Sequence, residues 1–432
     1  MCKRGLLTVT MEIYTIYDAF NEYLSYKTNE TKLVVFLFEN EKMKYQYEFF
    51  SNADNELIYN TILTLLYLVG ADKIVFNGDI ESYEFVKEKF EKSYDYVFYK
   101  NIFPNFSLKY VKYPLTNKIE VDKVDIEIKN TNKTIGIDVG GSDIKVVCLD
   151  GEKLLYSNEI IWHPKLNENL NYHINMINSI FDTALSYLNN DVDNIKISSA
   201  GVIKDNKIIL ANLFEKVDRS IHLDDINNFY VNAVKRLENR LNKKINYIVL
   251  NDGDVSSIAG MNHYKLDNVL GLALGTSFAS GYVNNNKVYP YLNELSSIPF
   301  DINNESTVFD YLSQEGVIRY AKLFNISFDK NLSKAEKLKV VQELFNQGNY
   351  SAKKVFYEIG SLLASFINYI SNFIIVNNVI LQGRVLSDNS GKYLYEVCKE
   401  KVHDNLNVFL PEESFVRLGQ AYTVSLINIK DC

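Results

Sequence analysis

The stretch TIGIDVGGSDIKVVCLDGEKLL, residues 134–155, carries the most informative pattern in this chain. Two apolar runs with the composition of β-strands are separated by Gly140-Gly141, with Asp138 before the glycines and Lys145 after them. A glycine pair between strands lets backbone N–H groups approach an anion, because no Cβ stands in the way. A plain hairpin with a bulge has the same appearance. The spacing alone therefore leaves an anion-binding turn and a structural turn as alternatives.

The polar residues around the glycine pair suit a bound phosphate group. Asp138 ends the first strand, where a carboxylate can hold Mg²⁺, usually through water. Ser142 can donate a hydroxyl hydrogen bond. Lys145 lies on the second strand, where its ammonium either counters phosphate charge or extends to solvent. These residue types favour the anion-binding turn.

A second polar segment, LNDGDVSSIAGM at 250–261, places Asp252 at the end of a strand and at the start of an expected helix. A carboxylate there can accept a proton from a substrate hydroxyl, while the helix N-terminus favours its charge. Aspartate is also a common helix cap, and Asp254 is an equally good candidate for capping. The segment therefore leaves a catalytic base and a cap as alternatives.

Two later segments repeat the pattern of a strand followed by a small-residue turn. LALGTSFASGYV at 272–283 offers amides and hydroxyls to phosphate groups from Gly275, Thr276 and Ser277. VILQGRVLSDNS is an apolar strand that ends at Gly383, where a nucleotide base can lie against exposed backbone. Four such turns in this order favour one phosphate-binding cleft over four unrelated turns.

Composition narrows the class of protein. The chain has 432 residues, of which 47% are hydrophobic and 23% charged, as in globular proteins. Its net charge of −8 argues against nucleic acid and an anionic membrane surface as partners. The most apolar window, 361–383, is interrupted by asparagines, so we expect a buried helix and a buried strand and no membrane span.

The cysteines are few and form no pairs or clusters in the sequence. A structural zinc site and a disulfide framework are therefore not expected, and a reducing cytoplasm suits the chain. The four positions are Cys2, Cys148, Cys398 and Cys432.

The order of elements predicts an α/β protein with an N-terminal domain at 1–130 and two lobes at 131–250 and 251–417. Each lobe opens on strands joined by a Gly/Ser/Thr turn, which indicates a duplicated fold with a cleft between its halves. Residues 418–432 are expected to return to the first lobe as a closing helix. Within 1–130 we expect strands at 32–38, 44–50, 72–77 and 94–99, helices at 56–70 and 83–92, and a polar connector at 118–133.

Together these motifs resemble the sugar-kinase branch of the superfamily that contains actin, the heat-shock chaperone ATPases and hexokinase. More specifically, they are similar to those of the ROK (repressor, open reading frame, kinase) family of glucokinase-like proteins. IGIDVGGSDIKVV and LALGTSFASGYV match the two phosphate motifs, LNDGDVSSIAGM the catalytic-base segment and VILQGRV the adenosine strand. FVRLGQAYTVSL, 415–426, resembles the closing helix. The resemblance implies a two-lobed actin-like ATPase fold, a duplicated ribonuclease H-like unit, here with an additional N-terminal α/β domain.

The resemblance also implies an activity, which is the ATP- and Mg²⁺-dependent phosphorylation of a hydroxyl on a hexose or hexose derivative. Asp252 would be the general base, and Asp138 would organise Mg²⁺ through water. The implied nucleotide-binding residues are Asp138, Gly140, Gly141, Ser142, Lys145, Gly275, Thr276, Ser277 and Gly383. The implied sugar-binding residues are Asn212, Asn251, Glu294 and Asp310, each of which could instead be a surface or capping residue.

Several departures from the family pattern keep other functions open. Glu294 is followed by Leu295 where the family has Gly-His, the family's His/Cys zinc loop is missing, and Asp310 replaces a longer glutamate. The second phosphate motif has lost glycines to residues 278–280, and Gln382 stands where a glycine is common. A catalytically weak or inactive sugar or nucleotide sensor of the same fold is therefore the alternative.

The first 130 residues lie outside the resemblance. They show no basic recognition helix, so a DNA-binding repressor is disfavoured. The segment 72–90 echoes the strand-turn-helix of an adenosine lobe, so the domain is either a truncated relative of the same fold or an unrelated α/β addition. The sequence leaves open whether the protein forms a homodimer.

Overall fold

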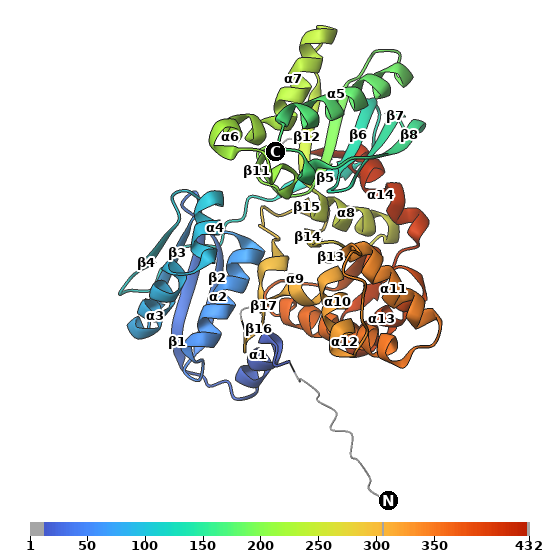
Figure 1. The fold of residues 1–432 in the computed structure, drawn as a ribbon. Helices are drawn as coiled ribbons and strands as arrows, with labels where there is room; N and C mark the ends of the chain where they lie inside the picture. The colour runs from blue at the N-terminus through green and yellow to red at the C-terminus, as the bar shows by residue number, and fades with distance from the viewer. Residues whose placement is uncertain (1–12, 305, 430–432) are drawn as a thin grey trace, which may run out of the picture.

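The computed structural model describes residues 13–304 and 306–429, which form two lobes and an N-terminal domain (Figure 1). The first lobe contains a five-stranded sheet in the order β12-β9-β6-β7-β8, in which β6 is antiparallel to β7 and parallel to β9. Its strands are β6 Lys133–Val139, β7 Asp143–Asp150, β8 Lys153–Ile161, β9 Asn194–Ser199 and β12 Asn246–Asn251. Its other elements are η1 Pro164–Leu166, α5 Leu170–Tyr187, β10 Val202–Lys204, β11 Lys207–Leu210, η2 Asn212–Phe214, α6 Arg219–Asn227 and α7 Phe229–Leu241.

The two faces of this sheet are covered by different helices. Ile135 and Ile137 share a core with residues of α5 and α7. The alternate residue Gly136 points to the opposite face, where an added Cβ would lie 2.5 Å from the carbonyl oxygen of Ala421 in α14, Glu413–Leu426. Glycine at 136 therefore lets α14 lie close to β6, and the same helix also contacts α8, Asp252–Tyr264, of the second lobe.

The second lobe repeats the strand order of the first. Its sheet runs β19-β18-β13-β14-β15-β5-β20, with β13 antiparallel to β14 and parallel to β18. The duplicated fold predicted from the sequence is therefore confirmed. These strands are β5 Val124–Ile128, β13 Val269–Leu274, β14 Phe278–Asn284, β15 Lys287–Val288, β18 Asn378–Gln382, β19 Asn407–Phe409 and β20 Ile427–Ile429.

The remaining elements of the second lobe are mostly helices that cover this sheet (Figure 1). The helix α12 and the strand β18 account for the apolar window 361–383, as predicted. Among the described residues no helix is long and apolar enough to cross a membrane. The elements are α8 Asp252–Tyr264, η3 Leu295–Ser297, β16 Pro299–Asp301, β17 Ser306–Thr307, α9 Val308–Tyr311, α10 Gln314–Leu323, α11 Lys334–Asn346, α12 Tyr350–Ile370, η4 Arg384–Leu386 and α13 Asp388–Lys401.

The N-terminal domain is a four-stranded sheet in the order β2-β1-β3-β4, with helices packed against it. In the lobes β6 is parallel to β9 and β13 is parallel to β18, but here β1 is antiparallel to both β2 and β3. This pairing favours an unrelated α/β addition over a truncated relative of the lobes, and the origin of the domain stays a prediction. Its elements are α1 Ile16–Ser25, β1 Thr31–Glu39, β2 Lys42–Phe50, α2 Asn55–Val69, β3 Lys73–Gly78, α3 Ile80–Glu91, α4 Tyr94–Ile102 and β4 Ser107–Tyr110.

Two expectations for this part of the chain were wrong. The segment 94–99 is helix α4, not a strand, because the Ser93 hydroxyl caps the Tyr96 N–H and Tyr99 and Ile102 are buried at helical spacing. The connector at 118–133 contains β5, which pairs with β15 and β20. The chain division at 130, 250 and 417 stays a prediction, and β5 shows that contacts cross the first of these points.

A continuous hydrophobic core joins the N-terminal domain to the second lobe. The Phe20 ring of α1 packs 5.3 Å from the ring of Tyr369 and 5.3 Å from that of Phe373. Tyr45 of β2 donates a hydrogen bond from its hydroxyl to the Phe373 carbonyl oxygen at 2.6 Å. The domain therefore packs against the second lobe through a shared hydrophobic core.

Candidate active site

Both predicted phosphate turns belong to one groove between the lobes. The first turn joins β6 to β7 and contributes Ser142, and the second joins β13 to β14 and contributes Gly275 and Thr276. The groove has a volume of about 1170 Å³ and is also lined by Lys145 and Gly383. Gly140 and Gly141 precede Ser142 in the first turn, and Ser277 closes the second turn by accepting the Gly275 N–H at 2.9 Å through its carbonyl.

The residues 278–280, which differ from the family's glycines, lie within β14 and not in the turn. The turn itself keeps a small residue at each of its positions, Gly275, Thr276 and Ser277. The altered residues therefore do not block the phosphate-facing side of the groove. An added Cβ at Gly383, which has a φ of 106°, would lie 2.3 Å from the Leu274 carbonyl oxygen, so only glycine allows β18 to end this close to the turn.

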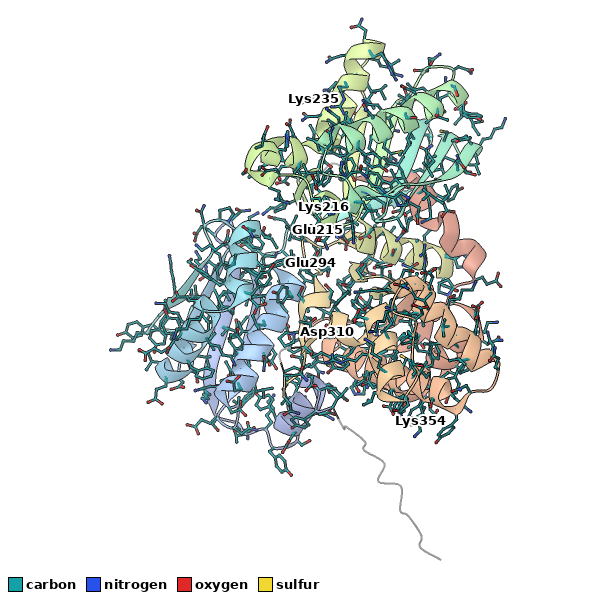
Figure 2. The ribbon with its side chains drawn as sticks, viewed as in Figure 1. Glu215, Lys216, Lys235, Glu294, Asp310 and Lys354 are labelled. Carbon is teal, nitrogen blue, oxygen red and sulfur yellow. The ribbon has the colours of Figure 1, made fainter. Side chains whose placement is uncertain are left out.

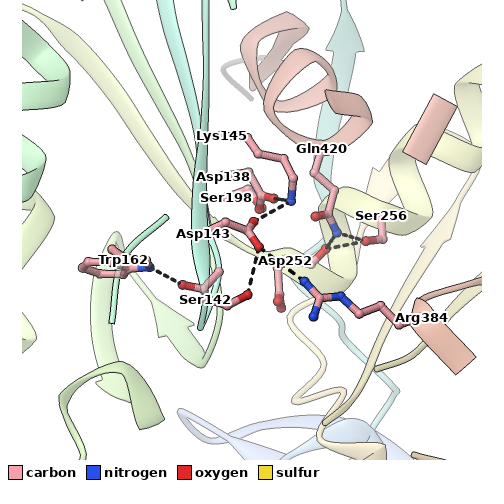
Figure 3. A network of polar contacts seen from close by, with 11 residues as sticks. Asp138, Ser142, Asp143, Lys145, Trp162, Ser198, Asp252, Ser256, Arg384 and Gln420 are labelled. Atoms are coloured by element: carbon pink, nitrogen blue, oxygen red, sulfur yellow. Dashed lines mark hydrogen bonds and ion pairs between the residues drawn. The ribbon is translucent and has the colours of Figure 1, made fainter. Parts of the chain in front are cut away.

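Lys145 is paired with two carboxylates and does not extend to solvent (Figure 3). Its ammonium lies 2.8 Å from Asp143 Oδ1 and 3.7 Å from Asp138 Oδ2. Burial lowers the pKa of Lys145, but the two carboxylates outweigh burial and raise the pKa above its usual value. Lys145 therefore stays charged at the first turn.

Asp138 is buried, and the Ser198 hydroxyl donates to its Oδ1 at 2.7 Å. Burial raises the pKa of Asp138, while Lys145 and Ser198 oppose that rise. The Ser142 hydroxyl donates to Asp143 Oδ2 at 2.9 Å. Burial would also raise the pKa of Asp143, but Lys145 and Ser142 together hold it below its usual value.

The single tryptophan of the chain holds the first turn in place. The indole N–H of Trp162 donates to the Gly140 carbonyl oxygen at 2.8 Å, and its backbone N–H donates to the Ser142 carbonyl at 3.1 Å. The backbone N–H of Gly140 donates to the Asp143 carbonyl at 3.0 Å. Because Trp162 is the only tryptophan, its fluorescence reports on this turn.

Asp252 stands at the start of α8, but Asn251 is the residue that caps this helix. Asn251 Oδ1 accepts from the Gly253 N–H at 2.8 Å, and its Nδ2 donates to the Gly201 carbonyl at 2.7 Å. The Asp252 carboxylate also accepts the Gly253 N–H, at 2.9 Å. Burial, with a further contribution from Asp138, raises the pKa of Asp252 to about 6, which lies in the range of a working general base.

Two more carboxyl groups with raised pKa values lie near Asp252. Burial raises the pKa of Asp254 to about 7, and Asn293 Nδ2 donates to its Oδ1 at 2.9 Å. Burial and the neighbouring Asp252 raise the pKa of Glu294 to about 7. Asp252 therefore interacts electrostatically with both Asp138 and Glu294.

The other predicted sugar-binding residues have different surroundings. Asn212 is exposed on η2 of the first lobe, and the Asn251 side chain is engaged in capping. The carboxylate of Asp310 accepts from the Thr307 N–H at 2.8 Å and from the Thr307 hydroxyl at 3.2 Å. Asn251 and Asp310 therefore both cap helices, while Glu294 lies where the three parts of the chain meet (Figure 2). Sugar binding by any of the four residues stays a prediction.

The structure adds residues that the motifs did not identify. Arg384 lines the groove, and its guanidinium lies 4.0 Å from Asp143 Oδ2 across the two lobes. Gln382 also lines the groove, is 9% exposed, and its Nε2 has no hydrogen-bond partner among the described residues. Ser198 reaches Asp138 because the two residues are partners in the parallel β6/β9 pair, a long-range pairing that no local pattern reveals.

These residues fit a nucleotide triphosphate with its magnesium ion. Two turns of small residues face one groove, Lys145 and Arg384 supply positive charge, and the unpaired amide of Gln382 offers a buried donor. No cluster of three or more metal-ligating side chains occurs among the residues that the structure describes. A hard cation that keeps most of its water, as Mg²⁺ does, needs only the single carboxylate of Asp138.

The overall architecture is that of the actin-like ATPases with two ribonuclease H-like halves. More closely, it is the fold of the ROK-family sugar kinases, although no family model and no curated protein matches the sequence. A ROK family glucokinase from Streptomyces griseus, solved in complex with glucose and AMPPNP, is 18% identical and superposes with a TM-score of 0.50 over 68% of this chain and 97% of its own. A putative sugar kinase from Cytophaga hutchinsonii is also 18% identical, with a TM-score of 0.51 over 67% of this chain and 98% of its own.

A ROK hexokinase from Thermus thermophilus is 13% identical, with a TM-score of 0.51 over 68% of this chain and 97% of its own. The matches span nearly the whole length of these proteins and about two thirds of this one. At such identities the likeness establishes the fold, and the chemistry has to be argued from the residues of this chain.

Proposed function

We propose that this protein is an ATP-dependent sugar kinase that phosphorylates a hydroxyl of a hexose or hexose derivative. The observation that carries the proposal is that turns from opposite lobes, at 140–142 and 275–277, contribute to one groove. Asp252, at the N-terminus of α8, lies near the groove residues Asp143 and Arg384 (Figure 3). The S. griseus neighbour was crystallised with both glucose and AMPPNP, which supports the same pair of ligands here.

In the proposed reaction the sugar hydroxyl oxygen attacks the γ-phosphorus of ATP. The new P–O bond forms as the bond to the β,γ-bridging oxygen breaks, and ADP leaves with that oxygen. Asp252 accepts the hydroxyl proton, which its pKa of about 6 allows at neutral pH. When bound, Mg²⁺ would neutralise phosphate charge, and Asp138 would hold it through water.

The remaining residues position the reactants and balance charge. Backbone amides of the two turns would hold the phosphates, because small residues leave their N–H groups accessible. Lys145 keeps its charge beside the first turn, and Arg384 faces the same groove from the second lobe. Glu294 would accept hydrogen bonds from sugar hydroxyls, since it lies close enough to Asp252 for the two carboxyl groups to interact. Phosphoryl transfer depends mainly on such positioning and charge stabilisation.

The proposal is tested by a coupled assay for ADP release on a panel of hexoses, amino sugars and N-acyl sugars. We expect turnover on at least one sugar, and a loss of about 10²–10⁴-fold in kcat for Asp252→Asn, as for other general bases. Trp162 fluorescence on nucleotide titration should show that the variant still binds ATP. If no sugar is phosphorylated and ligands only raise the melting temperature, the protein is a sensor of the same fold and the kinase proposal is wrong.

A further inference from the structure

The N-terminal domain reaches the segment that carries Glu294. The backbone N–H of Glu294 donates to the Tyr67 carbonyl at 2.9 Å, and that of Asn293 donates to the Leu68 carbonyl at 3.1 Å. Both carbonyls belong to the last turn of α2, where helix carbonyls have no partner within the helix. The end of α2 therefore binds a loop of the second lobe directly beside the candidate active site.

A buried lysine strengthens the same contact. Lys44 of β2 is 4% exposed, and its ammonium donates to the carbonyls of Val69 at 2.9 Å and Pro290 at 2.7 Å. Its third bond goes to Glu39 Oε2 at 2.7 Å, so all three of its donors are used. Lys44 thus ties the end of α2 to the start of the loop, four residues before Glu294.

Asn293 connects this contact to α8, the helix that begins at Asp252. It has a left-handed backbone with φ of 52° and is 6% exposed. Its Nδ2 bonds the Asp254 carboxylate in the first turn of α8, and its carbonyl oxygen accepts from the Ser280 hydroxyl at 2.6 Å. A continuous line of hydrogen bonds therefore runs from α2 through Asn293 to α8.

The N-terminal domain also contacts the first lobe on this side. Glu39, which balances Lys44, accepts from Lys204 of β10 at 2.5 Å through its other oxygen. The Lys204 ammonium lies 5.4 Å from the ring centre of Phe103, which follows α4. The domain therefore contacts both lobes, the second through Pro290 and residues 293–294 and the first through Lys204.

The electrostatics explain why this loop needs to be held. Glu294 and Asp252 are both carboxyl groups in a poorly solvated place, and two such charges repel each other. Left to itself, the loop would lower its free energy by turning Glu294 outward to water. The bonds from the end of α2 and from Lys44 oppose that movement.

We propose that the N-terminal domain is the positioning element of the acceptor site, with the end of α2 and Lys44 holding residues 290–294 so that Glu294 stays beside Asp252. Lys44 acts through the loop and touches no substrate, so it is a positioning residue. The inference rests on the proposed function as far as the acceptor is a sugar. It gives the domain, to which the sequence assigned no role, a part in substrate binding.

The test compares Lys44→Met with a matched lysine of the same domain. Methionine keeps the apolar stem and removes the ammonium. Lys32→Met is the control, because the Lys32 ammonium bonds the Ala53 carbonyl at 2.8 Å and does not reach the second lobe. We expect Lys44→Met to raise KM for the sugar at least tenfold and leave KM for ATP unchanged. Lys32→Met should change neither, and Lys44→Arg should restore part of the loss.

Two readouts separate positioning from loss of stability. Amide hydrogen exchange of residues 290–296 should accelerate in Lys44→Met and not in Lys32→Met, at a temperature where both variants are folded. The low-pH limb of kcat/KM should also move, because a loop released to water returns the pKa of Glu294 toward its usual value. Equal KM changes in the two variants, or unchanged exchange at 290–296, would overturn the inference. If the wild-type protein phosphorylates no sugar, the proposed function fails, while the exchange comparison still decides whether the domain holds the loop.

Discussion

The contact between Gly253 and Gly281 gives the most demanding test of how the fold positions Asp252. Gly281 lies in β14 and Gly253 in the first turn of α8, and their backbones touch. A Cβ added at Gly281 would lie 2.2 Å from the Gly253 carbonyl oxygen and 2.4 Å from the Asp254 nitrogen. A Cβ added at Gly253 would lie 2.0 Å from the Ser280 carbonyl oxygen. The substitution Gly281→Ala therefore forces α8 away from β14.

The geometry sets the size of the effect. Non-bonded carbon–oxygen contacts are stable only beyond about 3 Å, so α8 would have to move by roughly 1 Å. The clashing atoms are backbone on both sides, so the cost should be at the upper end for overpacking, about 3 kcal/mol in the free energy of unfolding. A shift of about 1 Å in a catalytic group typically costs about 10²-fold in rate. Gly281→Ala should therefore lose both stability and kcat/KM.

Urea denaturation and the ADP-release assay measure the two effects. Gly419→Ala in α14 is the matched control, because an added Cβ there meets no atom of the described residues within 4 Å. Alanine in a helix interior is favoured over glycine by about 1 kcal/mol, so the control should be slightly stabilised and equally active. If Gly281→Ala matches the wild-type protein in both measurements, then α8 does not rest against β14 as described, and the position of Asp252 is not fixed in this way.

Three further outcomes are expected. The kcat/KM for phosphorylation should begin to fall below about pH 7, where Glu294 is protonated, and fall more steeply below about pH 6, because protonation of Asp252 removes the base; a flat profile to pH 4.5 would contradict this. Lys196→Met should raise stability at pH 7 by about 2 kcal/mol. Lys196 is 4% exposed and burial lowers its pKa to about 8, so the wild-type protein gains stability as the pH rises from 8 toward 10.5. The melting temperature of the variant should show no such increase with pH. Arg384→Ala should weaken ATP binding about tenfold in Trp162 fluorescence titrations, since a bond to a charged group contributes about 1.5 kcal/mol; an unchanged Kd would exclude a phosphate contact.

The parts of the fold that were predictable from the sequence are those fixed by local chemistry. The hairpins at 133–150 and 269–284 are specified by apolar strands around three-residue turns, and both formed where expected. The strand β5 was missed because VDIEI is half polar, as suits a strand in which only Ile126 is fully buried. The segment 94–99 was misread because its aromatic residues have strand propensity, while its Ser93 cap and the burial of Tyr99 favour a helix.

The same division applies to the candidate site. Asp138, Asp252 and the two turns could be predicted because each lies at the end of an apolar strand. The contacts that orient these residues could not be predicted, because they depend on pairing between distant segments of the chain. Ser198 reaches Asp138 through the β6/β9 register, and Lys44 reaches Pro290 across 246 positions of the chain. Asn251 caps α8 because β12 ends at that residue. The residue types alone did not show which side chain in this segment would be the cap.

The place of β5 in the second sheet has a consequence for how this protein is made. Ile128 of β5 pairs with Ile427 of β20, so two strands that lie side by side in space are synthesised far apart in time. Until β20 has left the ribosome, one edge of β5 presents unpaired amide and carbonyl groups. Pairings of such long sequence separation form slowly, and exposed strand edges favour aggregation in the meantime. A nascent chain of this protein should therefore depend on chaperones until β20 is in place.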